Sequence, residues 1–297
     1  MPLLAHLSDL HITPPSWRSV GEISPKRVLG ALSWGLRRRH EHRPEVLEAL
    51  LRDLESTAPD RVLVTGDVTN QGLPREIEVG RQWLERLGGP ERVFLVPGNH
   101  DVYVPGSARA IAADWGPFLA GDGLPIGEER VRVRVTDGIA LIGVDSALAT
   151  SAGLATGRIG RIACLRLERC LRALGRRGLQ RVVMLHHPPW TQGIAGRRAL
   201  EDAAALQHVL ARAGAELVLH GHVHRLVFTR LTGPRCAIPV IGVPSASARG
   251  ARGSDCRARY HLLRPLRDGV WACRARVLDP TSGRFEEAPA RELRPQG

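Results

Sequence analysis

Short runs of apolar residues alternate along the chain with longer segments whose apolar positions recur at helical spacing. Six short runs predict buried strands, because most are rich in Val, Leu and Ile and end at Gly, Asp, Pro or His. Strand–helix alternation of this kind predicts an α/β protein with much parallel pairing. The predicted strands are Leu3–Leu7, Arg61–Thr65, Arg92–Val96, Ile139–Val144, Arg181–Leu185 and Glu216–Leu219, and the helices are Pro44–Ser56, Pro74–Leu87, Arg161–Arg176 and Ala199–Ala213.

Two pairs of strands interrupt this alternation, because an Asp-Gly dipeptide joins each pair at hairpin spacing. A mixed sheet, or two sheets, is therefore expected. The 297 residues can bury a sizeable core, and we expect one domain over residues 1–297 with a polar, proline-rich and partly disordered tail at 279–297. The hairpins are Val131–Thr136 with Ile139–Val144 across Asp137-Gly138, and Arg259–Pro265 with Val270–Val277 across Asp268-Gly269.

The composition is close to that of an ordinary globular protein, with 43% hydrophobic and 24% charged residues. No stretch reaches the roughly 18 apolar residues that a membrane span needs, and Pro2–Leu7 lacks the basic flank of a signal peptide. The five cysteines form no C-x-x-C pair, which favours free thiols in a reducing compartment, so we expect a cytoplasmic protein. They are Cys164, Cys170, Cys236, Cys256 and Cys273.

The formal net charge is +12, and Lys26 is the single lysine of the chain. An arginine excess over a whole chain is typical of coding bias, although positive charge also raises affinity for phosphates, nucleic acids and anionic lipids. Residues 14–43 are too long for an ordinary βα loop and are strongly basic, and we call them the basic insertion. Its charged residues are Arg18, Lys26, Arg27, Arg37, Arg38, Arg39 and Arg43 against Glu22 and Glu41.

Residues 26–39 of the basic insertion have an amphipathic pattern when they are drawn as a helix. One interpretation is peripheral contact with the inner membrane, because a basic helix with a Trp suits an anionic lipid surface. The other is a helix that packs its leucines on the core and exposes its arginines to solvent. The apolar face holds Val28, Leu29, Leu32 and Leu36, and the opposite face holds Lys26, Arg27, Trp34, Arg37 and Arg38.

Nearly every predicted strand is followed by side chains that bind metals. In open α/β sheets, functional sites form where the strands end, so five segments far apart in the sequence are expected to converge. Imidazole, carboxylate and amide donors without thiolate favour Mn, Fe, Zn or a similar ion. The segments are Asp9-x-His11, Gly66-Asp67, Gly98-Asn99-His100-Asp101, His186-His187-Pro188 and Gly221-His222-Val223-His224.

These residues suit hydrolysis of a phosphate ester at two adjacent metal ions. Asp67 is central in the set, so its carboxylate is the best candidate to bridge the ions. A metal pair lowers the pKa of a bound water and clamps the phosphoryl oxygens for in-line attack. His100 is then free to stabilise the phosphoryl group or to protonate the leaving oxygen, and Asp101 is expected to orient His100 from behind.

The five motifs together resemble the calcineurin-like metallophosphoesterase superfamily, whose pattern is D-x-H, G-D, G-N-H-D/E, H and G-H-x-H. The resemblance implies a four-layer α-β-β-α sandwich of two mixed sheets flanked by helices. It also implies two divalent or mixed-valence ions of Mn, Fe or Zn, and it favours His186 over His187 as a ligand. The implied ligands are Asp9, His11, Asp67 and His224 for the first ion, and Asp67, Asn99, His186 and His222 for the second.

The expected function is hydrolysis of a phosphodiester or pyrophosphate bond by a metal-activated hydroxide. Three substrates stay open: UDP-2,3-diacylglucosamine or a similar lipid-linked pyrophosphate at the membrane, a cyclic nucleotide, and a nucleic acid. The superfamily also contains scaffolds that have lost ligands and the catalytic histidine, but here all seven ligands and His100 are retained. The sequence does not predict the oligomeric state.

Overall fold

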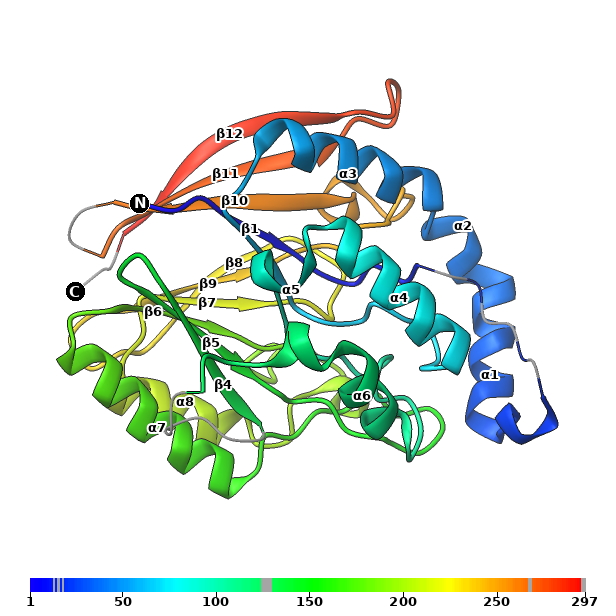
Figure 1. Cartoon of the computed structure of the whole chain (residues 1–297), viewed down its shortest axis with the longest axis horizontal. Helices are drawn as coiled ribbons and strands as arrows, with labels where there is room; N and C mark the ends of the chain where they lie inside the picture. Colours follow the sequence, from blue (N-terminus) through cyan, green and yellow to red (C-terminus); the bar gives the residue numbers. More distant parts are fainter. Residues whose placement is uncertain (13, 15–16, 18, 124–129, 267–268, 295–297) are drawn as a thin grey trace.

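The computed structural model describes residues 1–12, 14, 17, 19–123, 130–266 and 269–294. It contains two six-stranded sheets that lie against each other (Figure 1). The first sheet has the order β12 (Phe285–Leu293), β11 (Trp271–Leu278), β10 (Arg259–Pro265), β1 (Leu4–Leu7), β2 (Arg61–Val64) and β3 (Val93–Leu95). The second has the order β4 (Val131–Thr136), β5 (Ile139–Val144), β6 (Gln180–Met184), β7 (Leu217–His220), β9 (Ile238–Gly242) and β8 (Val227–Leu231).

Both sheets are mixed, as the two hairpins predicted. In the first sheet β1, β2 and β3 run parallel, and β10 to β12 are antiparallel to their neighbours. In the second sheet β5, β6, β7 and β9 run parallel, and the edge strands β4 and β8 pair antiparallel. The first hairpin turns at Asp137 and Gly138 with φ of 43° and 82°, whereas Asp268 of the second lies outside the described residues.

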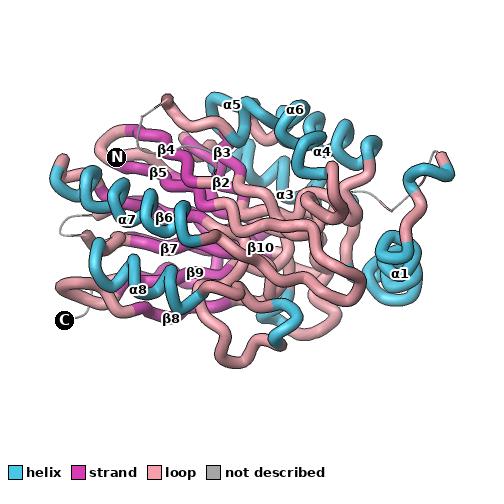
Figure 2. Tube along the Cα trace, turned by 90° about the horizontal axis from the view of Figure 1, so that it is seen from below, coloured by secondary structure: helices cyan, strands magenta, loops and turns pink. Residues whose placement is uncertain are grey.

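Alternation along the strands assembles the layers. In β1, Ala5 and Leu7 face α3 (Pro44–Thr57), α4 (Pro74–Arg86) and α6 (Ser107–Leu119), while Leu4 faces the second sheet. The outer face of the second sheet packs on α7 (Arg161–Arg176) and α8 (Ala203–Ala213), which cover that face and run roughly along its strands (Figure 2). The predicted four-layer α-β-β-α sandwich is therefore confirmed.

Two predicted segments need correction. The last helix begins at Ala203 and not at Ala199, because Gly157 pairs with Leu200 in a short β-bridge and holds the chain extended there. The expectation of disorder in the tail is wrong for Phe285–Leu293, which form β12 and pair along the whole of β11. A polar sequence is compatible with an edge strand whose side chains face water.

The basic insertion folds as α1 (Pro25–Ser33), a π-helical turn (Trp34–Arg38) and α2 (Arg39–Glu41), after a 3₁₀ turn (Val20–Glu22). The interpretation that packs the leucines on the core is wrong, since Lys26, Arg27 and Arg38 face the protein and the apolar side chains face outward. Leu29, Leu32 and Leu36 are 56, 57 and 76% exposed, whereas Arg27 is 7% exposed. The side chain of Arg37 lies outside the description.

Backbone carbonyls beneath α1 explain this orientation. Lys26 Nζ donates to the carbonyls of Tyr103 (2.8 Å) and Thr150 (2.9 Å). The guanidinium of Arg27 donates to the carbonyls of Glu22, Gln71 and Gly72. Buried loop carbonyls need donors, and cationic side chains supply strong ones. Within the described part of the chain, no helix is long and apolar enough to cross a membrane.

Candidate metal centre

The loops that follow the parallel strands of both sheets meet at one edge of the sandwich. Asp9 and His11 follow β1, Asp67 follows β2, and Asn99 follows β3. His186 follows β6, and His222 and His224 follow β7 in the other sheet. The backbone N–H of His222 donates to the carboxylate of Asp9 at 3.0 Å, which ties the two sheets together here. The structure thus brings all seven predicted ligands to one place.

The backbone of this edge is unusual, because most of the predicted ligands adopt left-handed conformations. Seven described non-glycine residues have positive φ, and five of them are predicted ligands. Such conformations are uncommon outside glycine and concentrate at functional sites, where the surrounding structure maintains them. The five, with their φ angles, are Asp9 (55°), His11 (46°), Asp67 (54°), His222 (69°) and His224 (52°).

Two glycines of the motifs permit close approach to the acidic side chains. A Cβ on Gly98 would collide with the carboxylate of Asp67. A Cβ on Gly221 would lie 2.6 Å from Oδ2 of Asp9 and would also collide with Ser8. Glycine is therefore required at both positions for the motifs to pack together.

The first group of donors consists of Asp9, His11, Asp67 and His224, whose ligand atoms all lie within 4.8 Å of one another. Nδ1 of His11 lies 3.0 Å from the carbonyl of Thr69, which can only accept, so Nδ1 carries the proton. The lone pair is then on Nε2, which lies 3.3 Å from Nε2 of His224. Nε2 of His224 also lies 3.0 Å from Oδ1 of Asp9.

The second group consists of Asp67, Asn99, His186 and His222. His186 donates from Nδ1 to the carbonyl of Thr65 (2.7 Å), and His222 donates from Nε2 to the carbonyl of Arg198 (2.9 Å). Their remaining nitrogens lie 3.2 Å apart. Nε2 of His186 also lies 3.1 Å from Oδ1 of Asn99 and 3.3 Å from Oδ2 of Asp67.

Electron pairs therefore converge in both groups, and a cation is the partner that satisfies them. Burial opposes protonation of His186, but the carboxylate of Asp67 outweighs it and raises the pKa of His186 to about 9. Burial likewise opposes ionisation of Asp67, yet the neighbouring imidazoles hold its pKa well below the usual range. Without a metal, the protonated ring of His186 and the ionised carboxylate of Asp67 therefore form an ion pair at neutral pH, and a bound metal ion would take the place of the proton on Nε2 of His186. The donor set fits metal ions of the Mn, Fe or Zn type.

The neighbouring His187 has other partners. Its Nδ1 lies 2.9 Å from the hydroxyl of Ser146, and its Nε2 lies 3.3 Å from the carbonyl of Ala155. Its ring still lies near those of His186 and His222. Because both ring nitrogens of His187 have protein partners, the geometry favours His186 as the donor.

His100 lies at the centre, but Asp101 does not orient it, and that prediction is wrong. The carboxylate of Asp101 accepts from the backbone N–H groups of Asp67, Thr69 and Gly98, each at 2.9 Å. It therefore shapes the two loops that carry the acidic and amide donors. The carbonyl of Asn70 accepts from Nδ1 of His100 instead, which leaves Nε2 of His100 towards the cavity.

The basic insertion supplies two site residues that the sequence motifs did not identify. Arg38 lies at the end of the π-helical turn, and its Nη2 lies 3.0 Å from Nε2 of His100 and 3.3 Å from Nε2 of His11. Single π-turns are frequent at functional sites. His42 is 7% exposed, and its ring centroid lies 4.5 Å from that of His11. Both line a cavity of about 710 Å³, together with Asp67, Asn99, His100, Arg198, His222, His224 and Arg252.

Comparisons with known proteins agree with this geometry. Residues 2–226 match the family model of the calcineurin-like phosphoesterases. The chain therefore belongs to the calcineurin-like phosphoesterase family, and it is a phosphoric ester hydrolase of the class that uses two metal ions.

The relatives extend over most of the chain. A probable cyclic nucleotide phosphodiesterase of Synechococcus sp. is 28% identical over 80% of this chain and 84% of its own length. The glycerophosphodiester phosphodiesterase GpdQ of Enterobacter lignolyticus is 30% identical over 77% of this chain and 73% of its own. A dimetal phosphatase of Danio rerio shares the fold, with a TM-score of 0.64 and 10% identity over 98% of this chain and 99% of its own.

Proposed function

We propose that the chain is a binuclear phosphodiesterase in which Asp67 bridges the two metal ions. The observation that supports this most strongly is the position of Asp67, which lies in both groups of donors. When bound, such a pair of ions polarises the phosphoryl group and activates water. The donors are Asp9, His11, Asp67 and His224 for the first ion, and Asp67, Asn99, His186 and His222 for the second.

His100 is proposed to act on the phosphoryl group or on the leaving oxygen. Burial, followed by the charge of Arg38, lowers the pKa of His100 to about 3, so the ring is neutral when the cavity holds no anion. A phosphate that binds beside it favours the protonated ring, because an opposite charge within a few ångströms raises the pKa of an imidazole. His100 can then donate from Nε2 while Asn70 keeps Nδ1 in place.

Arg38 is proposed to hold the phosphoryl oxygens. Its guanidinium keeps its charge at physiological pH and presents several donors in a fixed plane. It lies against the imidazoles of His11 and His100, at the point where the two donor groups meet the cavity. An anionic substrate that enters this cavity therefore meets a positive group already in position.

A substrate panel tests the proposal. The metal-loaded protein is assayed against bis(p-nitrophenyl) phosphate, a cyclic nucleotide, a glycerophosphodiester, UDP-2,3-diacylglucosamine and single-stranded DNA. The relatives named above make the cyclic nucleotide and the glycerophosphodiester the first choices. We expect diester hydrolysis that a chelator abolishes and added metal restores. Metal-loaded protein that cleaves none of the panel would contradict the proposal.

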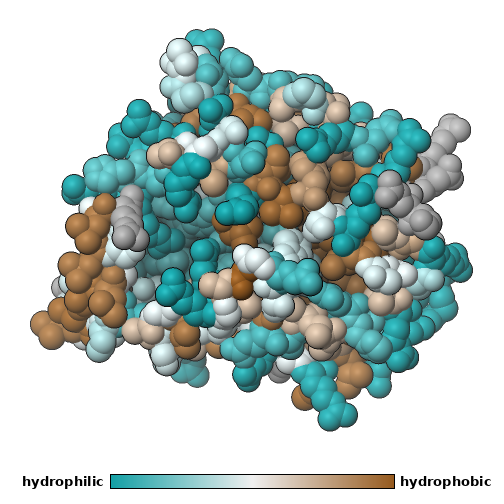
Figure 3. Space-filling view, turned by 180° about the vertical axis from the view of Figure 1, so that it is seen from behind, coloured by the Kyte–Doolittle hydropathy of each residue, from teal (hydrophilic) through white to brown (hydrophobic). Residues whose placement is uncertain are grey.

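A lipid-linked substrate is a second candidate, supported by the exposed apolar face of α1. Apolar side chains gather over α1 at one edge of the molecule (Figure 3), and Leu36 of the adjoining turn also lines the cavity. On this proposal the leucines contact acyl chains, whereas Arg27 and Arg38, which were expected beside anionic headgroups, contact the protein instead. The apolar contact would be interfacial, since the helix lies on the surface.

Sedimentation with lipid vesicles tests whether the apolar face of α1 contacts lipid, as the second candidate requires. Leu29→Ser with Leu32→Ser should release the protein from vesicles, whereas Ile162→Ser with Leu165→Ser on α7 should not. Ile162 and Leu165 are a matched control, being 68 and 50% exposed on a helix that does not line the cavity. If the unaltered protein sediments with neither neutral nor anionic vesicles, the second candidate is rejected and the first is unaffected.

A further inference from the structure

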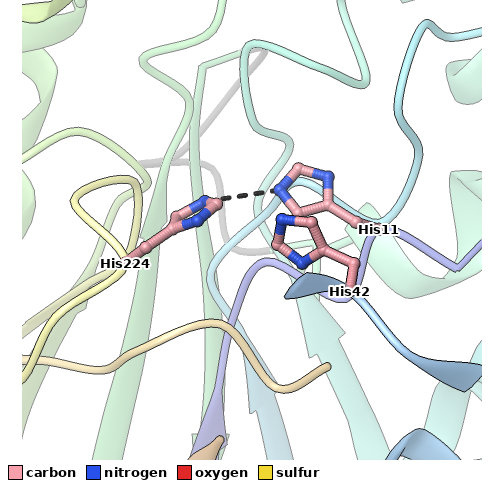
Figure 4. Close-up of side chains that lie close together, drawn as sticks. All are labelled: His11, His42 and His224. Carbon is pink, nitrogen blue, oxygen red and sulfur yellow. Dashed lines mark hydrogen bonds between the residues drawn. The ribbon is translucent and has the colours of Figure 1, made fainter. Parts of the chain in front are cut away.

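His42 places an imidazole beside His11 and His224, two members of the first group of donors, from outside all five motifs. It follows α2 in the basic insertion, and its backbone pairs with Ala248 in a short β-bridge. The rings of His11, His42 and His224 point towards one another from three separate segments (Figure 4). Their ligand atoms lie within 4.8 Å of one another, and all three residues are buried.

Two serines orient the ring of His42 and determine its tautomer. The hydroxyl of Ser245 lies 2.6 Å from the carbonyl of Asp9, an atom that can only accept, so Ser245 donates there. Ser245 then accepts from the hydroxyl of Ser247 (3.1 Å), and Ser247 accepts from Nδ1 of His42 (2.9 Å). This series of hydrogen bonds is complete only if Nδ1 of His42 carries the proton.

The lone pair of His42 is consequently on Nε2, the nitrogen that does not face the serines, and the ring lies against those of His11 and His224. Metal-binding histidines generally donate their second ring N–H to an oxygen that fixes the orientation of the ring. Ser247 has that relation to His42, as Thr69 has to His11 and Thr65 has to His186.

We propose that His42 is a third imidazole donor to the first metal ion, added to the family's pattern by the basic insertion. This rests on the proposed function, because it presupposes the metal centre. The first site then has three imidazoles beside Asp9 and Asp67, and the second has two beside Asp67 and Asn99. The richer nitrogen set favours ions such as Zn, Co or Fe at the first site over Mg or Ca, which prefer oxygen.

Titration of the metal-free protein with Co(II) tests the assignment without relying on turnover. In the unaltered protein we expect two bound ions and visible bands that report on the nitrogen donors. His42→Ala should weaken the binding of one of the two Co(II) ions on the order of 100-fold or more and change the visible bands of that ion. The other ion should bind as before. Ser247→Ala should weaken binding of the same ion about 10-fold, because the ring of His42 loses the nearer of its two serine acceptors and keeps only Ser245, whose hydroxyl lies 3.2 Å from Nδ1.

His40→Ala is the matched control, since His40 lines the same cavity but is exposed and hydrogen-bonded to Arg39. It should leave both affinities unchanged. Thermal unfolding of each variant without metal checks the fold, and His42→Gln replaces His42→Ala if the latter does not fold.

Equal Co(II) affinity and equal bands in the unaltered protein and in the folded His42 variant would overturn the assignment, even if turnover fell. If the unaltered protein bound no metal, this inference and the proposed function would both be rejected. If it bound two ions, lost one with His42→Ala and yet cleaved no phosphoester, only the proposed function would be rejected.

Discussion

The loops at the strand ends and the basic insertion both reach the same cavity, but the sequence predicts them with very different success. At the strand ends, the donors that were predicted lie where they were expected. In the basic insertion, the helix was predicted and its two faces were identified, but the apolar face is exposed and is not packed on the core. The difference shows that the end of a parallel strand fixes the position of the side chains that follow it. The amphipathic pattern of a helix does not determine which of its faces packs against the protein.

The physical reason lies in what each segment packs against. A parallel strand fixes the direction and register of the loop that follows it, so motifs after β1, β2, β3, β6 and β7 must converge. Helix α1 instead packs on loop carbonyls of Gln71, Gly72, Tyr103 and Thr150, which need hydrogen-bond donors. Amphipathic periodicity assumes an apolar partner surface, and here the partner surface is polar.

The largest effect is expected at the strand-end donor that both groups share. Asp67→Ala should abolish activity and reduce metal content at both sites, whereas Asp9→Ala should mainly empty the first site. Elemental analysis of the purified variants measures this. Two tightly bound ions per chain in Asp67→Ala would show that Asp67 does not bridge them. The role that the Gly66-Asp67 motif predicts for this residue would then be wrong.

His100→Ala should retain both metals and the fold but lose about 10²–10⁴-fold in turnover, the usual contribution of a general acid or a charge-stabilising group. The loss should be smallest for p-nitrophenyl esters, whose leaving group needs no proton. A comparison of p-nitrophenyl and alkyl esters is the measurement. Equal losses for both would favour charge stabilisation over proton donation.

The sequence supports the layered fold and the seven proposed ligands because both depend on patterns local to each strand and its end. It does not give the role of Asp101, since the partner of a carboxylate depends on which backbone N–H groups lie nearest in space. Nor does it give Arg38 or His42, which no motif contains. An imidazole and a guanidinium inside an insertion have no spacing signal, and only the packing of α1 directs them inward.

Arg38→Gln tests whether the basic insertion takes part in the chemistry. We expect kcat/KM to fall about 100-fold with little change in thermal stability, because the change removes a charge that faces the phosphoryl group. Arg38→Lys should restore part of the loss, since a lysine keeps the charge but not the planar donors. Unchanged kinetics in Arg38→Gln would show that Arg38 takes no part in the chemistry.

Arg27 and Leu32 test the inverted orientation of α1 directly. Arg27→Ala should reduce the free energy of unfolding by about 3 kcal/mol, because it leaves the carbonyls of Gln71 and Gly72 without a charged donor. Leu32→Ser should change it by less than about 0.5 kcal/mol, because Leu32 is 57% exposed. Urea denaturation measures both. The reverse order would mean that the leucines pack on the core after all.

A pH dependence of stability is expected at Glu76, beneath α1. Glu76 is 2% exposed and accepts from the backbone N–H groups of Gln71 and Leu73. Burial raises the pKa of Glu76 to about 7, although these hydrogen bonds and the charge of Arg27 oppose the shift. A carboxyl whose pKa is higher in the folded state than in the unfolded state stabilises the fold at low pH. That contribution is lost as the pH rises from about 4.5 to about 7.

Between pH 5 and pH 7 the unaltered protein should therefore lose about 2 kcal/mol of stability relative to Glu76→Gln, which cannot ionise. Urea denaturation of the metal-free proteins across this range measures the difference, with Glu78→Gln on the exposed face of α4 as the matched control. If the curves of the unaltered protein and of Glu76→Gln stay parallel from pH 5 to pH 7, Glu76 is already ionised at pH 5. The charge of Arg27 would then be balanced by an acidic partner beneath the helix, and the inward orientation of the basic face would have an electrostatic cause as well as a hydrogen-bonding one.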